Sequence, residues 1–142
     1  MTLFRYLVVP LFISVIFIGS DLLAKKAAIV IDFDTKEVLF EVNANTKNYP
    51  ASLTKIMTLY ILFDYLEKGK LTNESKLTVS RIAASRSPSK LYLEEGSKIK
   101  VEDAIMALII KSANDVATVV AESISGTEKE FAKLMTQYAK EL

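Results

Sequence analysis

The sequence predicts an α+β fold in which a short β-hairpin precedes a mostly helical region. Residues 27–32 and 38–42 are short apolar runs rich in β-branched residues, and the polar stretch from Asp34 to Glu37 separates them. Two such runs around a polar turn are typical of a hairpin. Beyond Ser52 the apolar residues recur at helical spacing. With 51% hydrophobic residues, the chain can bury a core.

Four segments after the hairpin have the pattern of helices: residues 53–68, 101–110, 114–125 and 127–142. The first is apolar on nearly every face, which predicts a buried helix. Gly69 and Gly126 are placed to end the first and third. Glu102 and Asp103 fall in the first turn of the second, where the helix dipole favours negative charge. Residues 76–80 are expected to be extended.

Composition limits the chemistry that the chain can perform. The 142 residues are enough for about one domain, and the net charge of +1 gives no reason to expect a nucleic-acid partner. The chain has no cysteine and no histidine. Disulfides, thiolate or histidine metal sites and a Ser-His-Asp triad are therefore excluded. We expect no metal and no cofactor, and a catalytic serine would need Lys, Asp or Glu as its base.

The first 24 residues predict an export signal. Arg5 gives a positive start, and the apolar run of residues 6–18 is shorter than the roughly 20 residues that span a bilayer. Ala24 is a suitable cleavage residue. The mature chain would then be residues 25–142. An uncleaved membrane anchor and a buried core helix are the alternatives.

Ser-x-x-Lys is the arrangement to test once histidine is excluded. On a helix, residues three apart share a face, so a lysine can take the proton of a serine one turn before it. Burial among apolar groups lowers the lysine pKa and makes the amine a usable base. Only Ser52 and Lys55 stand at the start of a strongly apolar helix. The other two matches, Ser87-Lys90 and Ser97-Lys100, fall in polar loops.

Ser52 has a simpler interpretation as the N-cap of the helix that follows it. A lysine in the first turn weakens that interpretation, because positive charge there opposes the helix dipole. A specific partner for Lys55 would make its position more favourable. On the local pattern alone, both interpretations stay open.

Ser112-Ala113-Asn114 is a second candidate and the one Ser-x-Asn in the chain. It falls between two predicted helices, where a tight junction could point a hydroxyl and an amide into one cleft. In the alternative, Ser112 and Asn114 end one helix and cap the next.

Together these residues resemble the D-alanyl-D-alanine carboxypeptidases, which are low-molecular-mass penicillin-binding proteins of the serine β-lactamase-like superfamily. Residues 49–58 (Tyr-Pro-Ala-Ser-Leu-Thr-Lys-Ile-Met-Thr) look like the active-site segment of that family. Leu93-x-x-Gly96, residues 101–103 and residues 111–115 (Lys-Ser-Ala-Asn-Asp) follow its pattern in the same order. The resemblance covers residues 27–142. It implies a β-lactamase/transpeptidase-like fold.

The resemblance also implies a role for each candidate residue. Ser52 would attack the carbonyl of a terminal D-Ala-D-Ala bond and form an acyl-enzyme, with Lys55 as general base. Ser112 would relay a proton to the leaving D-alanine, and Asn114 would bind the substrate amide. The implied substrate is a peptidoglycan stem peptide ending in D-Ala-D-Ala, and β-lactams would inhibit by acylating Ser52.

The third motif of the family, Lys-Thr-Gly or Lys-Ser-Gly, does not occur in this sequence. We therefore expect an incomplete fold that lacks the C-terminal strands of the sheet, in a truncated chain with little activity of its own or with a separate C-terminal half. The expected location is the periplasm or cell envelope, with peripheral membrane association open. A degenerate module that binds stem peptides or penicillins without turnover is the alternative, and a small helical envelope protein is a third class.

Overall fold

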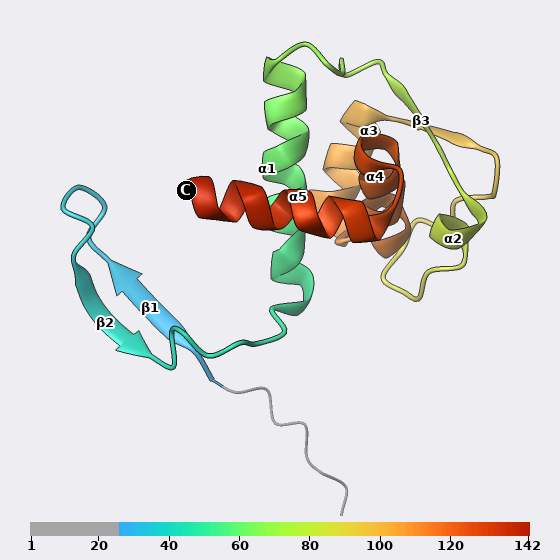
Figure 1. Ribbon diagram of the computed structural model, residues 1–142. Helices are drawn as coiled ribbons and strands as arrows, with labels where there is room; N and C mark the ends of the chain where they lie inside the picture. Colours follow the sequence, from blue (N-terminus) through green and yellow to red (C-terminus); the bar gives the residue numbers. More distant parts are fainter. Residues whose placement is uncertain (1–25) are drawn as a thin grey trace, which may run out of the picture. The chain divides into compact units, whose positions relative to one another are not determined.

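The computed structural model describes residues 26–142 (Figure 1). The predicted export signal lies outside the described residues. The chain divides into two compact units, one that ends at Tyr49 and one that contains residues 50–142. In residues 26–142 no helix is long and apolar enough to cross a membrane.

The described part of the first unit is the predicted β-hairpin. β1 (Ala28–Ile31) and β2 (Val38–Val42) form an antiparallel two-stranded sheet. Its turn is organised by Asp32, whose carboxylate accepts the N–H groups of Asp34 and Thr35 at 3.0 and 2.8 Å and the Thr35 hydroxyl at 2.9 Å. A short polar side chain that bonds to the backbone ahead of it is a common turn device. The hairpin prediction is confirmed.

The second unit carries every candidate site residue. Its elements are η1 (Ala51–Leu53), α1 (Thr54–Glu67), β3 (Lys76–Thr78), α2 (Arg81–Ala84), β4 (Lys98–Lys100), α3 (Val101–Met106), η2 (Ala107–Lys111), α4 (Asn114–Ser125) and α5 (Glu128–Glu141). The four predicted helices are confirmed, with bounds shifted by a few residues. The extended segment is β3, which pairs antiparallel with β4.

The second predicted helix changes character along its length, which the sequence pattern did not reveal. It is α-helical to Met106 and then continues as one turn of π-helix, η2. Such wider turns are rare and often stand next to functional sites. Here η2 ends at Lys111, immediately before the Ser-Ala-Asn segment.

α4 is the central element of the second unit and has half of its residues buried. α1, α2, β3, η2 and α5 all contact it, and α5 runs across α1 (Figure 1). The main apolar cluster contains residues of α1, α2, α3, α4, β3, β4 and η2. Its fully buried members include Leu62, Val79, Ala83, Val101, Ala104, Val116 and Val119. A second cluster of Ile61, Ala121 and Phe131 joins α1, α4 and α5. The site residues at the starts of α1 and α4 are therefore attached to a packed core.

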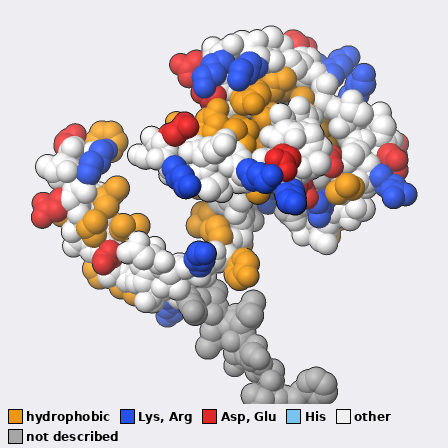
Figure 2. Space-filling view, in the orientation of Figure 1, with side chains coloured by type: hydrophobic (Ala, Val, Ile, Leu, Met, Phe, Trp, Pro, Cys, Tyr) orange, Lys and Arg blue, Asp and Glu red, His pale blue; other side chains and the backbone are white. Residues whose placement is uncertain are grey.

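The prediction that α1 is buried on every face is wrong within this unit. Thr58, Ile61 and Leu62 are its buried residues, on the side toward α4 and α5. Ile56 and Phe63 point away and are 65% and 48% exposed. The physical reason is that α4 and α5 cover one side of α1. Apolar side chains of α1 accordingly reach the surface of this unit, and Figure 2 shows hydrophobic side chains exposed on the face that it presents.

Candidate active site

Ser52 lies in the 3-10 turn η1, directly before α1, and is exposed. The backbone at the preceding Ala51 is left-handed, with φ of 49°. That conformation is costly for a residue with a Cβ, and such strain clusters at functional sites. Neither η1 nor α1 has a side-chain cap at its start. The interpretation of Ser52 as an N-cap is therefore wrong.

Lys55 occupies the first turn of α1 and is half-buried. Its Nζ donates a hydrogen bond of 2.7 Å to Oδ1 of Asn114, 59 residues further along the chain. Burial lowers the pKa of the Lys55 ammonium below the ordinary value of 10.5, because desolvation disfavours the charged form. The expected partner and the expected direction of the pKa shift are both present.

The Ser-Ala-Asn segment forms the tight junction between η2 and α4. Ser112 has a left-handed backbone with φ of 54°, and Asn114 is the first residue of α4. No side chain caps this helix. The Asn114 side chain instead bridges two segments: its Oδ1 accepts from Lys55, and its Nδ2 donates to the carbonyl of Ser87 at 3.0 Å. The cap interpretation fails for Asn114, while Ser112 does end the preceding helix.

The fold thus brings Lys55 and Asn114 into direct contact. Within residues 26–142, the hydroxyls of Ser52 and Ser112 make no hydrogen bond. In the two other Ser-x-x-Lys pairs the lysine has partners other than its serine, and Lys100 lies at the end of β4, not in the loop that the sequence predicted. Lys90 donates to the carbonyl of Ala84, and Lys100 pairs with Glu74 and Glu102.

Two hollows flank the contact between Lys55 and Asn114. One, of about 190 Å³, is mostly apolar and is lined by residues of η1, α1, α4 and α5, Lys55 among them. The other, of about 350 Å³, is lined by Arg86, Ser87, Asn114, Ala117, Thr118 and Glu128. Lys55 therefore borders a mostly apolar hollow, and Asn114 borders a more polar one.

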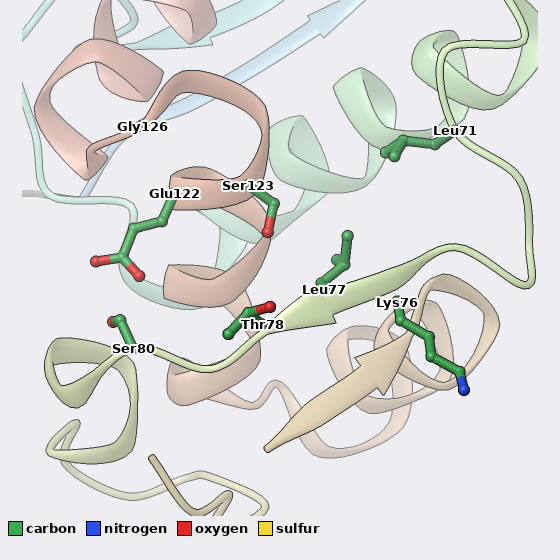
Figure 3. Close-up of a pocket in the computed structure, with 8 residues that line it drawn as sticks. All are labelled: Leu71, Lys76, Leu77, Thr78, Ser80, Glu122, Ser123 and Gly126. Atoms are coloured by element: carbon green, nitrogen blue, oxygen red, sulfur yellow. The ribbon is translucent and has the colours of Figure 1, made fainter. Parts of the chain in front are cut away.

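A larger hollow, of about 630 Å³, lies along β3 and the end of α4 (Figure 3). Its lining includes Thr78, Ser80, Glu122 and Ser123, and none of the four candidate residues. This hollow is larger than the other two. We take the two smaller ones as the candidate site because they adjoin the contact between Lys55 and Asn114.

Two features beside the site were not identified from the sequence. Arg86 donates through Nε to the Thr118 hydroxyl at 3.0 Å and pairs with Glu128, which connects the segment before Ser87 to α4 and α5. Asp115, next to Asn114, is fully buried. Its position in a helix first turn suggests only a favourable charge–dipole interaction, so nothing local in the sequence indicated burial.

A metal ion has no obvious place in the described part of the chain. Residues 26–142 contain no group of three or more acidic side chains arranged to hold one.

Comparison with known proteins shows the family of this chain. The family model described as D-alanyl-D-alanine carboxypeptidase matches residues 18–142. The chain belongs to this family. D-alanyl-D-alanine carboxypeptidase DacF of Bacillus subtilis is 42% identical over 117 residues, which are 82% of this chain and 30% of that protein. The chain therefore spans about a third or less of the length of such relatives.

Solved structures of the family are similar in fold to this chain. The carboxypeptidase DacD of Francisella tularensis matches 84% of this chain and 29% of its own, with a TM-score of 0.73 and 37% identity. Penicillin-binding protein D2 of Listeria monocytogenes, solved in an ampicillin-bound form, matches 81% of this chain and 45% of its own, with a TM-score of 0.67 and 30% identity. The predicted incomplete α+β fold of the penicillin-binding proteins is confirmed.

Proposed function

We propose that this chain carries the acylation half of a serine D-Ala-D-Ala carboxypeptidase, with Ser52 as nucleophile and Lys55 as general base. The observation that carries the proposal is the 2.7 Å hydrogen bond from Lys55 to Asn114, one turn after an exposed Ser52. It joins the two sequence motifs in one place. Membership of the carboxypeptidase family supports the same reaction.

The proposed reaction uses these side chains in two stages. Oγ of Ser52 attacks the carbonyl carbon of the penultimate D-alanine, and its proton passes to the neutral amine of Lys55. The C–N bond then breaks, and the proton taken up by Lys55 passes through Ser112 to the nitrogen of the leaving D-alanine, which restores the neutral Lys55 amine. Water hydrolyses the resulting ester and restores the Ser52 hydroxyl. Asn114 donates to or accepts from the substrate amide.

Lys55 must be neutral to accept that proton. A lowered pKa increases the neutral fraction at a given pH. The burial that lowers the pKa of Lys55 therefore supports its assignment as the base.

The proposed substrate is a peptidoglycan stem peptide that ends in D-Ala-D-Ala, and β-lactams are the proposed inhibitors. The ampicillin-bound relative supports the second assignment. Both assignments support a location at the cell envelope, and the periplasm is the finer proposal. A non-catalytic module that binds stem peptides or penicillins is the second candidate, favoured by the absence of any hydrogen bond from the Ser52 hydroxyl within residues 26–142.

Release of D-alanine separates the two candidates. We expect the full chain to release D-alanine slowly from a peptide ending in D-Ala-D-Ala and to leave the same peptide ending in L-Ala-L-Ala intact. Both peptides are followed by mass spectrometry, which detects the loss of a terminal alanine of either chirality. Saturable binding of the D-Ala-D-Ala peptide without any release would contradict the carboxypeptidase and favour the binding module.

A further inference from the structure

Asp115 is a buried carboxylate with backbone partners in place of a cation. It is 0% exposed, and no ion pair involves it within residues 26–142. Its Oδ1 accepts the N–H groups of Leu91 and Val116 at 3.1 and 2.9 Å, and its Oδ2 accepts those of Leu91 and Leu93 at 3.0 and 3.2 Å. A buried charge is unfavourable unless such donors compensate it. The carboxylate thereby fixes residues 91–93 against the start of α4.

The same stretch of chain holds Asn114 on its other side. The Ser87 carbonyl accepts from Asn114 Nδ2 at 3.0 Å, and the Ser89 carbonyl accepts from the Asn114 backbone N–H at 2.7 Å. The Ser89 hydroxyl donates to the Lys111 carbonyl at 2.7 Å. Residues 87–93, which we call the clamp loop, are thus attached to the η2–α4 junction on both sides of Asn114.

The clamp loop decides which end of the Asn114 amide faces Lys55. A carbonyl oxygen only accepts hydrogen bonds, so the Ser87 carbonyl requires the Nδ2 end of the amide. Oδ1 must then point the other way, where it accepts from Lys55 Nζ. Rotating the amide by half a turn would place two donors together at Lys55 and two acceptors together at Ser87.

We propose that Asp115 is a positioning residue for this site: by fixing the clamp loop it holds the Ser87 carbonyl in place and thereby keeps the Asn114 amide oxygen on Lys55. Asp115 touches neither Lys55 nor the substrate in this scheme. The contacts that hold the clamp loop and the Asn114 amide require no catalytic role of any residue. The effect of Asp115 on turnover rests on the proposed roles of Lys55 and Asn114.

Nuclear magnetic resonance of the ¹⁵N-labelled full chain tests the proposal without requiring activity. The Asn114 Nδ2 protons, held by the Ser87 carbonyl, should be protected from exchange with solvent. In Asp115→Ala we expect exchange to accelerate ~2- to 10-fold, the range that corresponds to loss of one typical hydrogen bond. Asp115→Asn keeps one accepting oxygen and should give an intermediate rate; if Asp115→Ala does not fold, this variant decides the question.

Val116→Ala is the matched control. It removes buried apolar contacts one residue further along α4 but leaves the Asp115 carboxylate in place. It should lower global stability and leave Asn114 exchange at the wild-type rate. Wild-type exchange in both Asp115 variants would overturn the proposal, as would equal acceleration in Val116→Ala. Penicillin acylation of the same variants is measured separately, so an inactive wild-type chain counts against the proposed function and not against the clamp.

Discussion

Replacing Lys55 with methionine lowers the rate of acylation by a penicillin by ~10²–10⁴-fold, the range that a positioned general base contributes. Methionine keeps the unbranched shape and the helix propensity of lysine, so α1 should be unaffected. What is lost is the amine beside Asn114, which takes the Ser52 proton in the proposed reaction. The measurement is the rate of labelling with a fluorescent penicillin.

Lys68→Met is the control for this prediction. Lys68 lies just after α1 and pairs with Asp64 on the surface, so its loss should leave labelling unchanged. Equal rates in wild type and Lys55→Met would show that the base lies elsewhere.

The acylation rate should also follow the protonation of Lys55. The neutral amine increases as pH rises through the Lys55 pKa, so the rate should rise with pH. Because burial lowers that pKa, the midpoint of the rise should fall below 10.5, the ordinary value. The corresponding rise should be absent in Lys55→Met. A rate that is independent of pH in the wild type would contradict the assignment.

Replacing Phe131 with alanine lowers the free energy of unfolding of the second unit by about 3–5 kcal/mol, the usual cost of removing a buried phenylalanine side chain. Phe131 is 3% exposed and packs with Ile61 and Ala121, so it attaches α5 to both α1 and α4. It also lines the apolar hollow beside Lys55. Urea unfolding should show a lower midpoint.

Leu142→Ala serves as the comparison, because Leu142 is 77% exposed after the end of α5. Its effect should stay within about 0.5 kcal/mol, as for most surface substitutions. Similar losses of stability in the two variants would mean that α5 is not held by its buried phenylalanine.

The local features of this fold could be predicted because local chemistry produces them. α4 begins and ends where its sequence indicated, at Asn114 and Ser125, and Gly126 follows it with a positive φ of 78°. The hairpin strands flank the polar turn that contains Asp34. Each of these depends on residues within a few positions of one another.

The site required information that spacing does not carry. Ser-x-x-Lys predicts that Ser52 and Lys55 lie close together at the start of the first helix, and it says nothing of Asn114, which reaches Lys55 only through the packing of α4 on α1. Asp115 was missed for a similar reason. Its burial depends on the clamp loop, which has no regular secondary structure and therefore no periodic pattern.

For Asp115 the sequence did not indicate the burial that the structure shows. For α1 it indicated more burial than the structure shows. Its apolar residues surround the helix, so periodicity predicted burial on every face. Which faces are covered depends on the neighbours that the fold supplies. In the second unit those neighbours are α4 and α5, and Ile56 stays 65% exposed.

The central claim, that Ser52 is an acylatable nucleophile, is tested most directly by mass spectrometry of the full chain after incubation with a penicillin. Attack opens the β-lactam ring and expels no group, so the chain should gain the mass of one whole penicillin, and digestion should place it on the peptide that contains Ser52. The added mass should be absent in Ser52→Ala and retained in Ser97→Ala, whose hydroxyl donates to the Glu94 carbonyl in a loop. Added mass that persists in Ser52→Ala, or that maps to another serine, would contradict the assignment.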